Sequence, residues 1–227
     1  MSAMTTEPVY VYEKPVRIWH AVNALAILVL AVTGYLIASP LTSPVTGEAS
    51  DHYIMGTIRF LHFSAGYILA VGLLGRIYLA FVGNEHARAL FLPPIHRPDF
   101  WQGVLREIRW YLFLEKVPAK HVGHNPLAAL ALFGLYVVGA AFMIVTGFAL
   151  YGEGTGAGSW AWNGFHWVIA LFGGSQNTHS WHHLGMWFMV CFIIIHVYVV
   201  VREDKLSRQS MLGTIATGWR TWNDDQP

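Results

Sequence analysis

Cysteine and charged residues are scarce in this 227-residue chain, and each scarcity excludes a class of function. The single cysteine, Cys191, excludes an internal disulfide, a cysteine-ligated iron–sulfur cluster and haem attached covalently through C-x-x-C-H. Charged residues make up 12% of the chain, against about 25% in a soluble domain. A net charge of +1 gives no electrostatic support for binding nucleic acid. The composition therefore predicts a protein surrounded by membrane lipid.

Long apolar runs, by contrast, are abundant, and four of them are long enough to cross a bilayer. They cover residues 18–38, 58–82, 126–151 and 182–201. The first begins near Ile18 and is long enough to stay in the membrane, so no cleavable signal peptide is expected. We predict an all-α fold, an integral four-helix transmembrane bundle formed by a single membrane domain, residues 1–227.

The segments between these runs are polar or amphipathic. Residues 40–51 form a turn-rich loop. Residues 99–114, rich in Trp and Arg, predict a helix lying at the membrane interface. Residues 160–172 predict a second, short interfacial helix, and residues 202–227 are expected to form a polar cytoplasmic tail.

The distribution of Lys and Arg predicts the orientation. Two lie before the first span, seven between the second and third if Arg76 near the end of the second span is counted, and four in the tail. The loop between the first two spans and the 151–181 loop contain none, apart from Arg59 just inside the second span. Because basic residues stay on the cytoplasmic side, we expect both termini in the cytoplasm and the protein in the bacterial inner membrane.

Two histidines in the last span share one side of a helix. His182 and His196 are 14 residues apart. Fourteen residues return an α-helix to within about 40° of the same face, about 21 Å further along its axis. Imidazole inside a membrane is costly and marks function, and it is a common axial ligand of haem iron.

Depth in the membrane sorts four histidines into two pairs. His62 and His182 each begin a span at the outer side, whereas His20 and His196 lie near the cytoplasmic side. We therefore predict two b-type haems held non-covalently, one between His62 and His182 and the other between His20 and His196, inside the helix bundle. A lone histidine at a span end is more often a hydrogen-bonded interfacial residue, but four matched in depth are hard to assign to chance.

Neighbouring residues leave alternatives open. His183 is the rival of His182, which we prefer because it keeps the 14-residue spacing to His196. His179 and His166 are expected at the outer surface. Glycines beside the proposed ligands, such as Gly34, Gly147 and Gly185, suit either a flat macrocycle or close helix packing.

Polar residues on the cytoplasmic side suggest further contacts. Arg76 follows His62 by 14 residues and is a candidate partner for the propionates of the inner haem, although a snorkelling arginine at the headgroups is the commoner case. His124 and Asn125 are candidate hydrogen-bond donors to a quinone. From chemistry alone, Asn125 is rather a helix cap before Pro126.

Several motifs resemble the b-type cytochrome subunit of membrane-bound nickel–iron hydrogenases, from about Tyr10 to Arg220. They are Arg17-Ile18-Trp19-His20, Arg59-Phe60-Leu61-His62-Phe63, Gly123-His124-Asn125-Pro126, Met143-Ile144-Val145-Thr146-Gly147-Phe148-Ala149 and His179-Ser180-Trp181-His182-His183-Leu184-Gly185-Met186-Trp187. The related gamma subunit of formate dehydrogenase has the same four spans and two haems.

The resemblance implies an electron-transfer subunit of a hydrogen:quinone oxidoreductase in the respiratory chain. Its partners would be the iron–sulfur small subunit and, through it, the large nickel–iron subunit. Electrons would enter at the outer haem and leave from the inner haem to quinone, and the resemblance assigns the same four histidine ligands. It also places Asn125 near a quinone site, although Pro126 departs from the relative's pattern. This chain lacks the cysteines of a hydrogen-activating centre.

Three alternatives differ in function. A cytochrome serving formate dehydrogenase or another periplasm-facing dehydrogenase keeps the fold and changes the partner. A zinc hydrolase using His179, His182 and His183 would need a nearby acidic base, and the nearest carboxylate in sequence is Glu153. A transporter with histidine proton relays would bind no haem.

Overall fold

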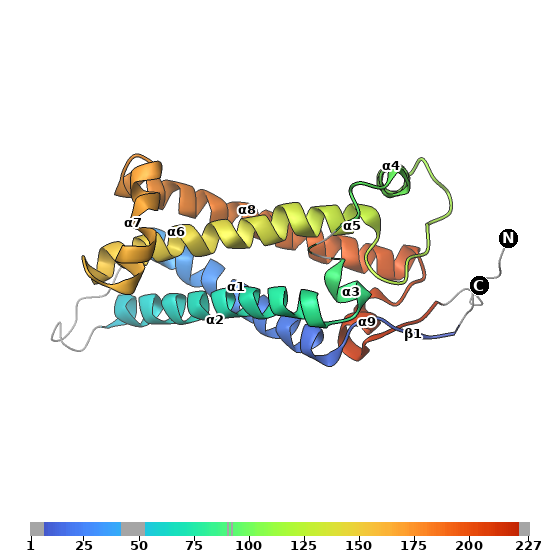
Figure 1. Cartoon of the computed structure of the whole chain (residues 1–227), viewed down its shortest axis with the longest axis horizontal. Helices are drawn as coiled ribbons and strands as arrows, with labels where there is room; N and C mark the ends of the chain where they lie inside the picture. Colours follow the sequence, from blue (N-terminus) through green and yellow to red (C-terminus); the bar gives the residue numbers. More distant parts are fainter. Residues whose placement is uncertain (1–6, 42–52, 90, 92, 223–227) are drawn as a thin grey trace. The chain divides into compact units, whose positions relative to one another are not determined.

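The structure is a computed structural model that describes residues 7–41, 53–89, 91 and 93–222. Four helices are long and apolar enough to cross a membrane (Figure 1): Lys14–Ala38, Ile54–Val82, Pro126–Thr155 and Ser175–Leu206. They correspond to α1 (Lys14–Ala38), α2 (Ile54–Val82), α5 to α6, and α8 (Ser175–Leu206). The predicted all-α membrane fold with four spans is confirmed. Each helix is as long as the predicted span or longer.

The third span contains three consecutive helical segments. They are α5 (Pro126–Ala131), the π-helix η2 (Leu132–Val137) and α6 (Val138–Thr155). Asn125 caps α5 and Pro126 occupies its first position, where a missing N–H costs nothing. A π-turn inside an α-helix re-aims the side chains that follow it and is frequent at functional sites.

The chain forms two compact units whose boundaries fall within the long helices. Unit 1 comprises residues 1–20, 75–137 and 192–227, and unit 2 comprises residues 21–74 and 138–191. Each unit therefore takes a stretch from every long helix, and each contains one of the two predicted histidine pairs.

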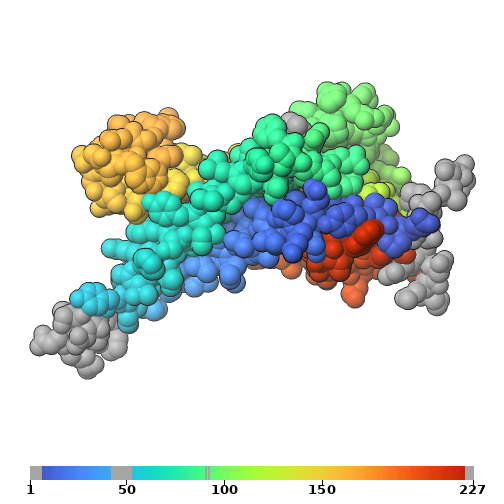
Figure 2. All heavy atoms as spheres, turned by 60° about the horizontal axis from the view of Figure 1, so that its bottom comes forward, coloured from blue at the N-terminus to red at the C-terminus, as the bar shows by residue number. Residues whose placement is uncertain are grey.

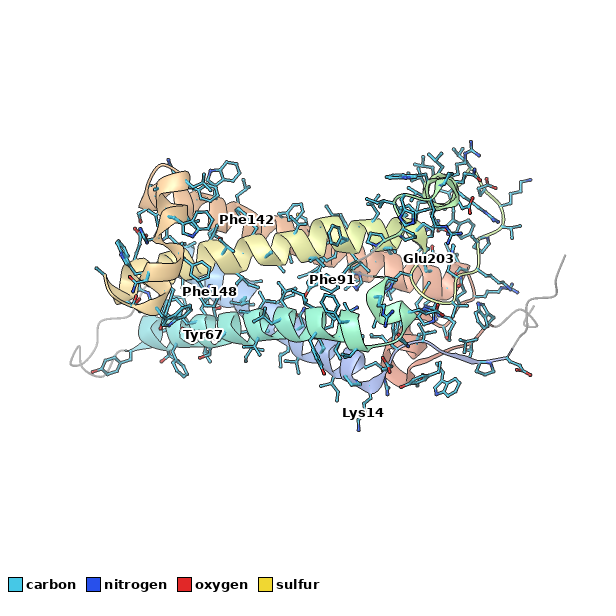
Figure 3. All side chains as sticks on the ribbon, viewed as in Figure 1. Lys14, Tyr67, Phe91, Phe142, Phe148 and Glu203 are labelled. Atoms are coloured by element: carbon cyan, nitrogen blue, oxygen red, sulfur yellow. The ribbon has the colours of Figure 1, made fainter. Side chains whose placement is uncertain are left out.

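Unit 2 includes α7 (Trp160–Leu171), the predicted outer interfacial helix. Ser159 caps α7 by accepting a hydrogen bond from the Trp162 backbone N–H. At Gly152, α6 and α7 approach so closely that a Cβ atom would lie 2.8 Å from the Trp162 nitrogen. Aromatic rings surround this junction, and Figure 3 shows Tyr67 and Phe148 facing each other, with ring centroids 5.5 Å apart.

Unit 1 includes α3 (Glu85–Arg88) and α4 (Pro98–Tyr111), the predicted interfacial helix. One side of α4 buries Phe100, Val104 and Glu107. The adjacent side exposes large apolar residues at helical spacing, namely Trp101, Leu105, Ile108 and Leu112. An amphipathic helix with an unburied apolar face and arginines beside it is typical of the membrane interface.

The C-terminal segment differs from the expected polar tail. The helix α8 continues to Leu206, and α9 (Met211–Thr217) and β2 (Trp219–Arg220) follow it. The strand β2 pairs antiparallel with β1 (Val9–Tyr10), close to the start of the chain. In Figure 2 the red C-terminal segment lies against the blue N-terminal segment.

Polar contacts explain why α8 remains helical beyond its apolar part. Arg202 and Glu203 form a buried ion pair of 2.8 Å. The indole N–H of Trp110 on α4 donates to Glu203 at 2.8 Å, and the Arg202 guanidinium lies over the Trp110 ring at 5.0 Å. Arg202 and Glu203, which were expected to lie in a polar tail, therefore hold the end of α8 against α4. The predicted loop 40–51 lies, beyond Leu41, outside the described residues.

Candidate haem-ligand sites

In unit 2 the imidazoles of His62 on α2 and His182 on α8 lie next to each other. Their ring centroids are 6.5 Å apart and their planes are inclined by 77°. An imidazole nitrogen binds a transition metal at about 2 Å and the ring centroid lies about 1 Å further, so two imidazoles on one iron have centroids about 6 Å apart. The separation of His62 and His182 fits that arrangement.

Threonine hydroxyls select which nitrogen of each ring is free. Thr33 Oγ1 lies 2.9 Å from His62 Nδ1, and Thr146 Oγ1 lies 2.8 Å from His182 Nδ1. Each hydroxyl donates its only hydrogen to a carbonyl one turn earlier, at Val29 (2.6 Å) or Phe142 (2.8 Å). Each threonine oxygen must therefore accept from Nδ1–H, which leaves Nε2 of both histidines with a lone pair for a metal.

Glycines follow both threonines and give the rings space. A Cβ atom at Gly34 would lie 3.2 Å from His62 Cε1, and one at Gly147 would lie 3.3 Å from His182 Cε1. Gly185 differs, since its Cβ would meet Met143 and Phe142 side chains at 2.6 and 2.9 Å. Gly34 and Gly147 thus serve the imidazoles, whereas Gly185 serves helix packing.

Sequence reasoning did not identify Thr33 and Thr146. The signal was present, because the dipeptide Thr-Gly occurs in both the first and the third span, each facing a proposed ligand on the next span. Recognising it requires the register between helices, which hydropathy does not provide.

The other histidines of α7 and α8 in unit 2 make local contacts. His183 Nε2 accepts a hydrogen bond of 3.1 Å from the Trp187 indole. His179 and His166 bond to carbonyls one turn earlier, at Ser175 (3.0 Å) and Trp162 (2.9 Å). In the described part of the chain, no three His, Cys, Asp or Glu side chains are grouped as a metal site.

Unit 1 contains the second pair, His20 on α1 and His196 on α8. The ring of Phe192, one turn before His196, stacks on it at 5.8 Å. Phe192 in turn stacks on Tyr136, whose ring meets that of Trp19, the residue before His20.

Arg76 is buried in the same unit, with 2% of its surface exposed. Its Nη2 donates to the Ala87 carbonyl at 2.7 Å, and its guanidinium lies over the rings of Trp19 (5.5 Å) and Phe91 (5.3 Å). In the part of the chain that the structure describes, its Nε and Nη1 have no hydrogen-bond partner. A snorkelling arginine would place these groups in water, so Arg76 departs from that commoner case.

His124 and Asn125 lie at the start of α5. Burial, together with the charges of Arg76 and Arg220, lowers the pKa of His124 to about 4, so its imidazole is neutral at physiological pH. The hydroxyl of Tyr12 lies 3.3 Å from His124 Nε2. Asn125 Oδ1 accepts the Ala128 backbone N–H at 2.6 Å, which confirms the helix-cap interpretation.

Four apolar spans and a pair of opposed imidazoles with free Nε2 atoms define a class, the membrane-embedded cytochromes that bind haem without a covalent link. Comparison with known proteins gives the particular family. A profile of the prokaryotic cytochrome b561 family matches residues 11–218. The chain is 62% identical over 219 residues to the probable Ni/Fe-hydrogenase B-type cytochrome subunit of Azotobacter chroococcum mcd 1, covering 96% of this chain and 91% of that protein.

Two further relatives carry similar names. The probable Ni/Fe-hydrogenase B-type cytochrome subunit of Cupriavidus necator is 54% identical over 225 residues, covering 98% of this chain and 91% of its own. The probable Ni/Fe-hydrogenase 1 B-type cytochrome subunit of Escherichia coli (strain K12) is 50% identical over 216 residues, covering 93% and 90%. The chain belongs to the prokaryotic cytochrome b561 family, among the b-type cytochrome subunits of nickel–iron hydrogenases. The family implies b-type haem.

Proposed function

We propose that this chain carries electrons across the bacterial inner membrane, from the iron–sulfur small subunit of a nickel–iron hydrogenase to membrane quinone. It does so through two b-type haems, an outer one bound by His62 and His182 and an inner one bound by His20 and His196. Haem supplies one-electron exchange at its iron, and the chain supplies ligands, orientation and charge. The names of the relatives support the small and large hydrogenase subunits as partners.

The observation that carries this proposal is the facing pair of imidazoles in unit 2. His62 and His182 come from different helices, their centroids are 6.5 Å apart, and each has Nδ1 engaged by a threonine. Hydrogen bonds of this kind orient an axial histidine and raise its basicity. Gly34 and Gly147 leave room beside the rings.

The inner site is supported by charge as well as by ligands. His20 and His196 belong to one unit, and Arg76 is buried there with its Nε and Nη1 atoms lacking a hydrogen-bond partner among the described residues. A buried guanidinium requires an anion, and the propionates of a haem are suitable ones. Arg76 is therefore a candidate propionate partner.

The proposed quinone site lies beside the inner haem on the cytoplasmic side. A neutral His124, hydrogen-bonded to Tyr12, is able to donate a hydrogen bond to a quinone carbonyl without bringing a charge into the site. The Oδ1 of Asn125 is engaged in capping, so its Nδ2 is the group proposed to reach the quinone. Both termini are proposed to lie in the cytoplasm.

Substitution of the outer ligands tests the assignment. His62→Ala or His182→Ala should remove one of two b-type haems from the purified complex, because a single axial imidazole remains. Reduced-minus-oxidised spectra and haem extraction would measure this loss. Hydrogen-dependent quinone reduction should fall at least tenfold, whereas hydrogen-dependent dye reduction, which does not require this chain, should persist.

His183→Ala is the matched control, since it removes an adjacent imidazole with a different partner, Trp187. It should retain both haems. Two haems in either ligand variant would refute the pairing, and a wild-type complex without a b-type α-band would refute the cytochrome function altogether.

A further inference from the structure

Arg220, near the C-terminal end of the described chain, is buried like Arg76. Only 1% of its surface is exposed. Its Nη1 contacts Met211 Sδ at 2.7 Å, and its Nε has no hydrogen-bond partner among residues 7–41, 53–89, 91 and 93–222. In the described part of the chain no carboxylate forms an ion pair with Arg220 or with Arg76.

The backbone fixes Arg220 beside the start of the chain. In the β1–β2 ladder Arg220 pairs with Val9. The carbonyl of Gly218 accepts hydrogen bonds from the N–H groups of Val11 (2.7 Å) and Tyr12 (3.2 Å). Gly218 has φ of 94°, and a Cβ atom there would lie 2.6 Å from the Tyr10 ring. Only glycine suits this position. The presence of glycine at residue 218 therefore allows the C-terminal segment to pack against Tyr10 and Tyr12.

The two arginines share the same neighbours. Burial raises the pKa of the Tyr12 hydroxyl, while the charges of both Arg220 and Arg76 lower it. Both charges also act on His124, whose ring contacts the Tyr12 hydroxyl. The carboxylate that acts on Arg220 is Asp204, and it already accepts the Leu212 backbone N–H at 3.0 Å. Among the described residues, the cluster thus has two buried guanidinium groups and no closely paired anion.

Ring contacts connect this cluster to the inner histidines. The guanidinium of Arg76 lies over Trp19, the residue before His20. From Trp19 the contacts continue through three further rings, with centroids 6.1, 6.1 and 5.8 Å apart, to Tyr136, Phe192 and His196. All these residues belong to unit 1. Arg76 therefore belongs to the group of contacting side chains that includes His196, and Arg220 is related to that group through Tyr12 and His124.

We propose that Arg76 and Arg220 bind the two propionate carboxylates of the haem held by His20 and His196. The C-terminal segment, residues 210–222, thereby completes the inner haem site. Two guanidinium groups match two propionates in charge, and the planar donors of arginine match a carboxylate in geometry. This inference rests on the proposed function. It adds Arg220 as a second partner of the propionates, and it gives residues 210–222, which were expected to form a polar tail, a role in haem binding.

The phosphate of an anionic lipid headgroup offers the same chemistry to two arginines. The propionates are favoured because the contacts from Arg76 lead to both inner histidines. A lipid occupant is a distinct outcome of the test.

The test is spectroelectrochemical titration of both haems in the purified complex carrying Arg220→Met, Arg220→Lys or Arg76→Met. A cation beside the propionates favours the reduced haem, so its loss should lower one midpoint potential and leave the other unchanged. At fixed potential we expect at least a tenfold change in the ratio of oxidised to reduced inner haem, which equals 59 mV for a one-electron couple. Arg220→Lys keeps the charge and should shift the potential in the same direction by less.

Arg106→Met is the matched control, because it removes an exposed arginine on α4 and should move neither potential. Unchanged potentials in the Arg76 and Arg220 variants would overturn the proposal. If a methionine variant does not accumulate, Arg220→Lys decides the question, because an unchanged potential there, with haem content equal to wild type, also counts against propionate binding.

A second arm separates the lipid from the haem. Native mass spectrometry would compare anionic lipid bound to the wild type and to Arg220→Met. Loss of a bound anionic lipid with unchanged potentials would assign the arginines to a headgroup and refute propionate binding. Both arms of the test require that the wild-type complex contains two b-type haems. If the proposed function is wrong, the wild-type spectrum lacks the b-type α-band, and this result is seen before any variant is compared.

Discussion

At the scale of single residues, Thr33 and Thr146 give the outer imidazoles their orientation. Thr146→Val keeps the shape of the side chain and removes the acceptor for His182 Nδ1–H. The imidazole becomes a weaker donor, so retention of the outer haem should fall by about 10- to 100-fold. Its midpoint potential should rise, because a less basic ligand stabilises ferric iron less. Thermal release of haem and redox titration would measure both effects.

Thr155→Val provides the control for this change. Thr155 lies on the same helix and its hydroxyl also donates to a carbonyl one turn earlier, at Tyr151, but it touches no proposed ligand. It should leave both haems at wild-type potentials. If Thr146→Val behaves like Thr155→Val, the hydroxyl does not govern the ligand.

Asn125 has two roles that different substitutions separate. Serine is a good helix cap, so Asn125→Ser should keep α5 stable, whereas Asn125→Ala should cost about 1 kcal/mol of stability. Both changes remove the amide Nδ2. If that group donates to quinone, both should raise the KM for quinone with both haems retained. If only the alanine variant changes, the residue is a cap and nothing more.

At the scale of helices, the close contact of α6 with α7 depends on Gly152. A Cβ atom there would lie within 3 Å of the Trp162 nitrogen and the Ala161 carbonyl carbon, which are backbone atoms and cannot rotate away. Gly152→Ala should therefore destabilise the protein by about 1–3 kcal/mol, as expected for overpacking. Gly154→Ala, two residues later on the same helix, meets nothing within 4 Å and should be neutral or slightly stabilising. Thermal unfolding in detergent would compare them, and equal melting temperatures would contradict this account.

How far the sequence predicts each element depends on where its interactions lie. The four spans and α4 were predictable because apolar runs and helical periodicity are local. The extension of α8 to Leu206 was not, since Arg202 and Glu203 are stabilised by Trp110, which is distant in sequence. The pairing of β2 with β1 was missed for a similar reason, because a two-residue strand carries no periodic signal and its partner lies at the opposite end of the chain.

The same distinction applies to the candidate sites. Depth and spacing predicted that His62 would meet His182, and the structure brings their rings together. Neither Thr33 nor Arg220 was predicted, because each acts on a group from another helix or from the other end of the chain. Gly218, whose φ is positive, is a local sequence feature that was consistent with a tight turn before β2.

At the scale of the whole molecule, the proposed route requires the two ends of the spans to lie on opposite sides of the membrane. In a Cys191→Ser background, which removes the only native thiol, single cysteines can report the side. Asn163→Cys on α7 should react with a membrane-impermeant maleimide in intact cells stripped of their outer membrane. Val117→Cys, exposed in the loop between α4 and α5, should react only after lysis.

Both replaced residues are uncharged, so neither change alters the distribution of Lys and Arg that predicts the orientation. The native Cys191 thiol is exposed on α8, so without its removal a lipid-facing background signal would blur the comparison. Labelling of both positions from one side would mean that the third span, Pro126–Thr155, does not cross the membrane. One pair of imidazoles could then not receive electrons outside while the other delivered them inside, and the proposed transfer across the membrane would fail even if both haems were present.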